Sequence, residues 1–337
     1  MKPLYNVNRT GSHYFLLGTG PAEDRCALFM QVREGRKMDY EVFKKEVKDR
    51  IISCLPEEYQ NWKVEERQVY KINRTLDSFH LMPSCEKKGT GAYPTFYYNE
   101  CFELLHNGMT MNGILHMIAE AVQEWTYHDP VPGNTLDMTV FRDDIICAVV
   151  SQKWNTGFLE TIPHRKFLDL AVIYRVHVYE KDGGRSGMTV TNEYLEMLGM
   201  SLEELHEHAM KRTLERLPAE LTDLNQEYKF HPGVKLPPIF MLSNTARDFG
   251  AAMILYTDVM DMAAEVMGGS FYILPGSIHE LYLVPESPEH IPFYRELVAN
   301  ANRNVSDIGD WLSDHIYLYN AENHRLTLVT EREGTLA

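Results

Sequence analysis

The sequence has few cysteines, and no two of them form a paired motif. They are widely spaced and odd in number, namely Cys26, Cys54, Cys85, Cys101 and Cys147. Such a pattern predicts neither a disulfide framework nor a zinc site. Because structural disulfides accumulate in oxidising compartments, the pattern favours a reducing cytoplasm.

Long hydrophobic runs are also missing. Even the longest uninterrupted apolar stretches, such as Ile145–Val150, are only about six residues. A membrane-spanning helix needs about 20 apolar residues. The first residues, Met1–Asn6, lack the charged and then apolar order of a signal peptide. We therefore expect no membrane partner and a cytoplasmic location.

Basic residues are outnumbered by acidic ones. The chain has 33 Lys and Arg against 48 Asp and Glu, which gives a formal net charge of −15. A chain of this charge repels a phosphate backbone instead of displacing its counterions. The balance argues against nucleic acid as a partner.

What is present is the composition of a folded protein. Hydrophobic residues make up 44% and aromatic residues 11% of the 337 residues. A packed core is expected, and a chain of this length normally divides into more than one structural unit. The oligomeric state does not follow from composition.

The chain is expected to begin with an extension and a first mixed unit. Residues 1–37 predict short strands at Tyr14–Leu17 and Cys26–Val32. A helix with Asp39 as its N-cap should open a compact unit at 38–128. Its expected order is α-β-β-β-α, with strands at Val64–Ile72, Ser78–Met82 and Thr95–Tyr98 and a last helix that begins near Thr110.

A linker at 129–137, rich in Pro and Gly, should separate this unit from a second one at 138–330. The second unit alternates short strands, hairpins and helices, including a long strand at Leu168–Tyr179. Helices are expected at Asn192–Leu198, from Ser201 with a capping box, and at Thr257–Met267, where Gly268 ends the helix. The predicted fold class is α+β, made of two mixed units with largely antiparallel sheets and hairpins, and with helices packed on the sheets.

Signature motifs of common enzymes are absent. The sequence contains no phosphate-binding GxxxxGK[ST] or GxGxxG, no HExxH and no GxSxG. This lowers the expectation of an enzyme without removing it, because many sites are assembled from residues far apart in sequence.

The densest polar cluster is Ser277-Ile278-His279-Glu280, at a turn between two apolar strands. Ser277 and His279 supply a nucleophile and a base, with Glu280 as the neighbouring carboxylate. On an ideal strand Glu280 faces the other way, so a triad would need a carboxylate from elsewhere. A structural or ligand-contacting turn is the simpler interpretation.

Candidate ligand-binding residues lie around a second cluster. Arg165 and Arg175 are suited to an anion because a guanidinium binds carboxylates through two nitrogens, and His164 adjoins them. The competing interpretation is that both arginines pair with carboxylates of this acidic chain. The remaining candidates are Asn192 and Asn244.

No metal site and no cofactor are predicted. His206 and His208 lie two positions apart on a predicted helix, so they do not share a face. Only Glu204 with His208 does, and a solvated helix surface explains these residues.

Several blocks of sequence carry a resemblance to a known family. They include 163–176, which begins Pro163-His164-Arg165, then 191–195, 201–206, 242–244, 271–280 and 312–317. In their order they resemble an uncharacterised bacterial family of gut Firmicutes, domain of unknown function 5688. The resemblance spans about Met38 to Tyr319, and it implies a bacterial cytosolic protein but no activity, cofactor or site residue.

Two functions are therefore open. The first is a non-enzymatic binding or accessory protein that recognises an unknown protein or small-molecule ligand. The second is a hydrolase-type enzyme that uses Ser277 and His279, with Arg165 or Arg175 holding an anionic substrate. The two differ in whether the side chains of Ser277 and His279 meet.

Overall fold

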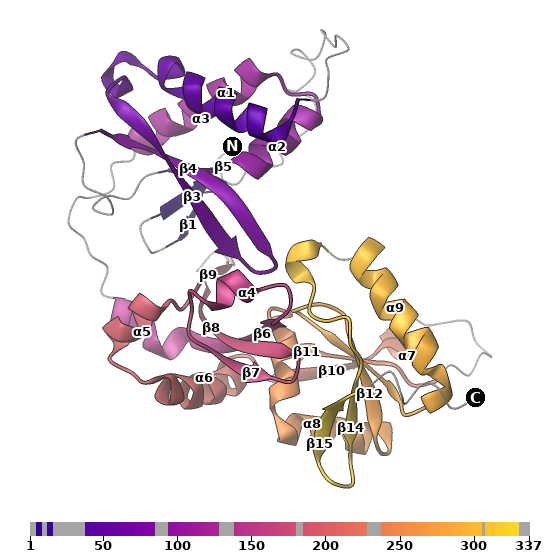
Figure 1. Cartoon of the computed structure of the whole chain (residues 1–337). Coiled ribbons are helices and arrows are strands. Elements are labelled where there is room, and N and C mark those ends of the chain that lie inside the picture. The colour runs from indigo at the N-terminus through magenta and orange to yellow at the C-terminus, as the bar shows by residue number, and fades with distance from the viewer. Residues whose placement is uncertain are drawn as a thin grey trace. The chain divides into compact units, whose positions relative to one another are not determined.

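The computed structural model describes residues 5–8, 12–15, 38–84, 94–127, 138–179, 185–227, 237–304 and 307–329 (Figure 1). The expected strand at Cys26–Val32 and the expected linker at 129–137 lie outside these residues. Contacts between residues divide the chain into two units. Unit 1 is Met1–Tyr70 with Thr75–Leu136, and unit 2 is Lys71–Arg74 with Asp137–Ala337.

Unit 1 is a sheet with helices. Its strands are β1 (Tyr5–Asn8), β2 (Ser12–Phe15), β3 (Trp62–Lys71), β4 (Arg74–Pro83) and β5 (Thr95–Tyr97), in the order β1-β2-β5-β4-β3. Its helices are α1 (Tyr40–Cys54), η2 (Glu57–Tyr59), α2 (Tyr98–His106) and α3 (Met111–Tyr127). The predicted α-β-β-β-α order was incomplete, because α2 follows β5 before α3 begins.

The core of unit 1 follows from helical spacing. Asp39 caps α1 by accepting a hydrogen bond from the backbone of Glu41 at 3.0 Å, as predicted. Three apolar side chains four residues apart, Phe43, Val47 and Ile51, then lie on one face of α1 and are fully buried. They belong to one core cluster with apolar residues of α2, α3, β4 and β5.

The β3–β4 hairpin is tighter than predicted. The sequence suggested a connection over 73–77, but β4 already begins at Arg74. The turn consists of Ile72 and Asn73, and Asn73 has a φ of 57°. Two-residue hairpin turns need positive φ, which Asn tolerates better than most residues.

Unit 2 contains two further sheets. The first consists of β6 (Ile145–Ser151), β7 (His164–Phe167), β8 (Leu170–Tyr179) and β9 (Arg185–Thr189), and the second is β10 (Ala219–Asp223), β11 (Phe240–Asn244), β13 (Leu281–Pro285), β12 (Phe271–Pro275), β14 (Tyr317–Asn320) and β15 (Arg325–Leu328), in that spatial order. The helices are η3 (Met138–Asp144), α4 (Thr156–Leu159), α5 (Asn192–Leu198), α6 (Leu202–Arg216), α7 (Leu224–Glu227), η4 (Gly250–Leu255), α8 (Thr257–Met267), η5 (Pro288–His290), α9 (Ile291–Asn304) and η6 (Ile308–Asp310).

Strand β8 is the centre of the first sheet. It pairs with β6 along one edge, and β7 and β9 share its other edge, all antiparallel. The predicted strand at Leu168–Tyr179 was therefore wrong at its start: β7 ends at Phe167, and Leu168, with a φ of 53°, makes a sharp turn into β8.

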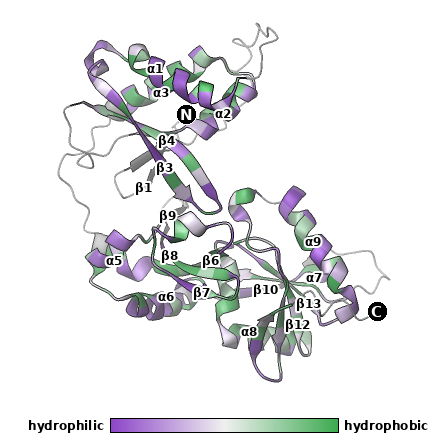
Figure 2. Ribbon diagram, in the orientation of Figure 1, coloured by the Kyte–Doolittle hydropathy of each residue, from purple (hydrophilic) through white to green (hydrophobic). Residues whose placement is uncertain are grey.

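The two sheets of unit 2 share one core, which includes Val149 of β6, Ile173 of β8 and Ile273 of β12. The alternate residues Tyr272 and Leu274 of β12 pack in a separate cluster with apolar side chains of α9. Figure 2 shows the contrast between hydrophobic β6 and largely hydrophilic α6. The second sheet is thus buried on both faces, as strands with continuous apolar runs require.

Local signals confirm several predicted boundaries. Helix α5 has the predicted bounds, and α6 begins with the capping box in which Ser201 and Glu204 exchange hydrogen bonds. Helix α8 ends at Gly268, which has a φ of 81°. The fold is α+β with mostly antiparallel sheets, and no helix in the described ranges is long and apolar enough to cross a membrane.

Candidate functional site

The loop between β11 and η4 is strained and closely held. Arg247 and Phe249 have φ angles of 50° and 52°, which non-glycine residues adopt at a cost. The buried side chain of Asn244 offsets this cost, because its Nδ2 donates to the carbonyl of Asp248 at 2.7 Å and its Oδ1 accepts from the backbone of Ala246 and Asp248. The loop conformation places the carboxylate of Asp248 and the ring of Phe249.

Gly250 lets this loop pack against the β12–β13 turn. A Cβ atom at this position would come within 2.2 Å of Ser243 Oγ, 2.5 Å of the His279 carbonyl oxygen and 2.8 Å of the Asn244 nitrogen. Ser243 Oγ donates to the same His279 carbonyl at 2.8 Å. Only glycine fits here without displacing the turn that carries His279.

Asp248 is the centre of the cluster. Its Oδ2 lies 3.0 Å from His177 Nε2, and its Oδ1 lies 3.3 Å from His279 Nδ1. Burial by itself raises the pKa of Asp248, but the two imidazoles outweigh burial and hold that pKa well below its usual value. Asp248 is therefore ionised at neutral pH.

His279 is held by two carboxylates and one backbone amide. The backbone N–H of Phe249 donates to Nδ1 at 3.1 Å, and Nε2 lies 3.5 Å from Asp310 Oδ1. Burial lowers the pKa of His279, but Asp248, Asp310 and Glu280 outweigh it, so the pKa lies above its ordinary value. In the neutral ring Nδ1 accepts from Phe249, whereas in the protonated ring it carries a hydrogen and turns to Asp248 as its partner.

Arg175 is a partly buried cation next to this cluster. Its Nη1 donates to Thr189 Oγ1 at 2.9 Å, and its Cζ lies 4.4 Å from the centre of the Phe249 ring. Burial lowers the pKa of Arg175 to about 10, although Asp248 raises it. Among the described residues, no carboxylate lies within 4.0 Å of the guanidinium, which makes it a candidate for an external anion.

Four of the predicted site residues meet in this cluster, namely Arg175, Asn244, Ser277 and His279. Glu280 adjoins the cluster, but His164, Arg165 and Asn192 lie elsewhere. Arg165, on β7, binds both carboxylate oxygens of Glu203 at 3.0 and 3.1 Å, so it pairs as the competing interpretation expected, whereas Arg175 does not. His164 contacts the Ile162 carbonyl, Asn192 is exposed in the first turn of α5, and Glu280 accepts from Tyr282 at 3.4 Å.

Ser277 does not have the surroundings of a nucleophile. Its Oγ accepts a hydrogen bond from the backbone nitrogen of His279 at 3.0 Å and thereby stabilises the turn. Within the described part of the chain, no hydrogen bond joins Ser277 Oγ to the imidazole of His279. A serine hydrolase needs that bond to activate the hydroxyl.

Sequence reasoning missed His177, Asp248, Phe249 and Asp310. One signal was available for His177, because residues two apart on a strand share a face and Arg175 was already a candidate. Asp248 follows no periodic pattern, and 71 residues separate it from His177. Its role emerges only from the folded loop.

Comparison with known proteins identifies a family. Residues 40–321, more than half of the chain, match the model of a family of unknown function, DUF5688. The match confirms the part of the prediction that named domain of unknown function 5688. No curated protein matches the chain, and no solved structure does.

Proposed function

Because the chain belongs to DUF5688, a family of unknown function, its function has to be inferred from the site, and we propose that it is a binding protein that holds a small anionic ligand at Arg175. The single observation that supports this proposal is a desolvated guanidinium without a carboxylate within 4.0 Å among the described residues. A buried charge without a close counter-ion is costly, and a bound anion offsets that cost.

The surroundings of Arg175 suit an anion with planar oxygens. The Phe249 ring covers one face of the guanidinium, and Thr189 occupies Nη1. Gly187, on the neighbouring strand, is exposed, and a Cβ there would lie 3.6 Å from Nη2. The glycine leaves Nη2 uncovered by a side chain, so that a carboxylate or phosphate oxygen can approach it.

Asp248 does not by itself oppose an anion. Its Oδ2 lies 3.0 Å from His177 Nε2. Its negative charge is compensated by His279, because the raised pKa of His279 favours the protonated imidazole. In this arrangement Asp248 keeps the two imidazoles in place and Arg175 remains the group that meets the ligand. The hydrolase alternative has no comparable support, since Ser277 Oγ is occupied by its own turn.

The proposal is tested by titrating the full chain with inorganic phosphate and with citrate at constant ionic strength, using calorimetry. A charged hydrogen bond contributes about 1.5–3 kcal/mol, so Arg175→Met should weaken binding of the preferred anion by about 10-fold or more. Arg165→Met is the matched control and should bind as the wild type does, because Arg165 is engaged by Glu203.

The ligand-free Arg175→Met protein supplies a second measurement. Replacing a partly buried cation that lacks a close counter-ion with an apolar side chain is often neutral or stabilising. We therefore expect its melting temperature to be equal to or above that of the wild type. Unchanged anion affinity in Arg175→Met, or a wild type that binds neither anion, would contradict the proposal.

A further inference from the structure

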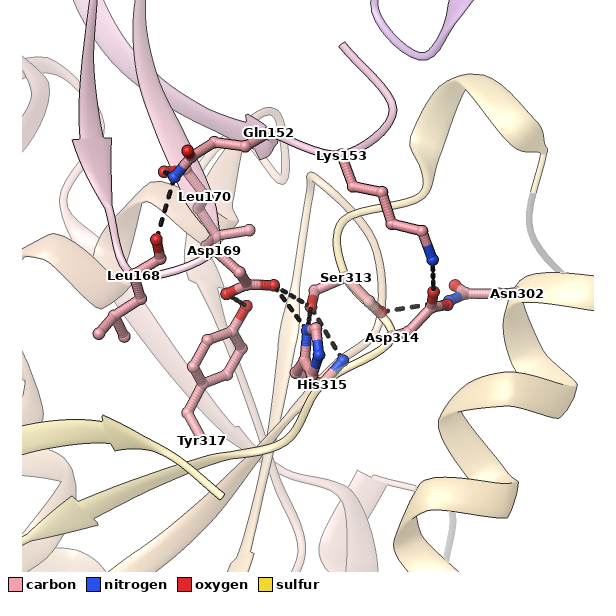
Figure 3. A network of polar contacts seen from close by, with 10 residues as sticks. All are labelled: Gln152, Lys153, Leu168, Asp169, Leu170, Asn302, Ser313, Asp314, His315 and Tyr317. Atoms are coloured by element: carbon pink, nitrogen blue, oxygen red, sulfur yellow. Dashed lines mark hydrogen bonds and ion pairs between the residues drawn. The ribbon is translucent and has the colours of Figure 1, made fainter. Parts of the chain in front are cut away.

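A second polar cluster of unit 2 lies where the β7–β8 turn meets the segment before β14, and it is built around Asp169 (Figure 3). Asp169 Oδ2 accepts from Ser313 Oγ at 2.6 Å and lies 3.0 Å from His315 Nδ1. Asp169 Oδ1 accepts from Tyr317 OH at 2.9 Å. More than 140 residues separate the carboxylate from these three partners in the sequence.

The position of the carboxylate is set by a clamped turn. Leu168 takes a φ of 53°, which costs about 1–2 kcal/mol for a residue with a side chain. Gln152 holds the turn through three hydrogen bonds. Its Nε2 donates to the carbonyl oxygens of Leu168 and Leu170 at 3.0 and 2.6 Å, and its backbone N–H donates to the carbonyl oxygen of Asp169. Such strain persists where the surroundings over-determine it.

The segment that carries His315 is held from two further sides. Asn302 of α9 donates to the Ser313 carbonyl and to Asp314 Oδ1, each at 3.2 Å. Lys153 Nζ lies 3.0 Å from Asp314 Oδ2. Figure 3 shows Lys153 reaching Asp314 on one side while His315 faces Asp169 on the other. The backbone at His315 is thus fixed, although 54% of its side chain is exposed.

The hydrogen bonds define where the protons lie. Burial raises the pKa of Tyr317 well above its ordinary value, so its hydroxyl is a donor near neutral pH. Ser313 Oγ accepts from the backbone of His315 and directs its own hydrogen at Asp169, which removes it as a nucleophile. The neutral His315 ring then carries its hydrogen on Nδ1, facing the carboxylate, and has its lone pair on Nε2. Among the described residues Nε2 has no partner.

We propose that the Asp169–His315 pair is a second site, in which His315 Nε2 attacks uncharged acyl compounds and Asp169 is its positioning residue. The pairing of a carboxylate with Nδ1 is the part of a catalytic triad that orients the imidazole and stabilises its positive charge. The carboxylate of Asp169, 3.0 Å from the ring, disfavours an anionic substrate and favours a neutral ester.

Water is the only co-reactant that the reaction needs. The Nε2 lone pair forms a bond to the acyl carbon, and the carbon–oxygen bond to the leaving group breaks with its electron pair going to the oxygen. Asp169 compensates the charge of the acyl-imidazolium. Water then adds to the acyl carbon and releases one proton to solvent. The carbon–nitrogen bond breaks with its electron pair returning to Nε2, and the carboxylic acid leaves.

This site is separate from the proposed anion site. Arg175 lies six residues beyond Asp169 on β8, which corresponds to about 20 Å along an extended strand. Failure of one proposal therefore leaves the other intact, and each has its own variants.

The test is hydrolysis of p-nitrophenyl acetate by the full chain, followed through release of p-nitrophenolate. His315→Gln should lower the protein-dependent rate by at least about 10-fold, and the exposed position of the ring should leave folding unchanged. His116→Gln is the matched control, because His116 also faces a carboxylate, Glu120 at 3.2 Å, but on an open helix surface. It should retain the wild-type rate.

Asp169→Asn separates positioning from packing. If Asp169 sets the tautomer of His315, the variant should both lower the rate and displace the midpoint of the pH profile, which a packing defect would not move. Tyr317→Phe, which keeps the ring and removes one hydrogen bond to Asp169, should show a smaller change in the same direction. A His315→Gln protein as fast as the wild type, or an unchanged pH midpoint in the folded Asp169 variant, overturns the proposal.

Discussion

Replacing Asp248 with Asn tests the electrostatics of the candidate site. The two imidazoles lie 3.0 and 3.3 Å from this carboxylate, and a hydrogen bond to a charged group contributes about 1.5–3 kcal/mol. The asparagine amide keeps one acceptor oxygen and removes the cost of a buried charge. Part of the stabilisation from the two hydrogen bonds is therefore retained. We expect the free energy of unfolding near pH 6 to fall by about 2 kcal/mol.

The effect of the substitution on stability should depend on pH. The pKa of Asp248 is depressed in the folded protein. Its contribution to the free energy of unfolding is therefore present above the pKa of the unfolded state and is lost as the pH falls through the pKa of the folded state. The pKa of His279 is raised, so its contribution is complete below 6.5 and is lost as the pH rises through the folded value. Wild-type stability should therefore decline above about pH 6.5, whereas that of Asp248→Asn should be nearly flat there.

Urea unfolding of both proteins at several pH values between 5 and about 9 measures the difference. Asp143→Asn is the control, because Asp143 faces His208 at 3.5 Å but is 76% exposed, and exposed pairs contribute about 0–1 kcal/mol. Parallel curves for the wild type and Asp248→Asn above pH 6.5 would refute the reasoning.

Two further substitutions test the packing of the loop and of β6. Gly250→Ala should lower the free energy of unfolding by about 1–3 kcal/mol, because its Cβ would overlap Ser243 Oγ. Gly199→Ala is the control in the same thermal melt. It has no atom within 4 Å but a φ of 63°, so it should show only the smaller cost of the backbone conformation. Thr213→Val should cost about 1–3 kcal/mol, because it leaves the backbone N–H of Cys147, now 2.8 Å from Thr213 Oγ1, without an acceptor; Thr213→Ser should be close to the wild type, and equal losses in both would point to packing instead.

Much of the fold was predictable because its signals are local. The N-cap at Asp39, the capping box of Ser201 with Glu204, and the helix stop at Gly268 all act within a few residues. The turn at Leu168 was not predictable, because leucine is a poor turn former and its conformation depends on Gln152, which lies 16 residues away. A remote side chain there overrides the local preference.

The candidate site was predictable only in part. Arg175, Asn244, Ser277 and His279 are polar residues next to apolar strands, so their residue types and strand positions drew attention to them. Their roles were not visible. Ser277 Oγ binds the backbone instead of the imidazole, and His279 takes its carboxylate from Asp248 instead of Glu280.

The sequence by itself determined the family, the α+β class and several helix boundaries, since caps and hydrophobic periodicity are interactions between near neighbours. Tertiary structure alone decided which polar groups meet. His177 and Asp248 are 71 residues apart, and Asp169 and Ser313 are 144 apart. Such pairs form only when packing of the core brings their strands and loops together, because the chain entropy lost in closing loops of that length is recovered by burial of the whole core.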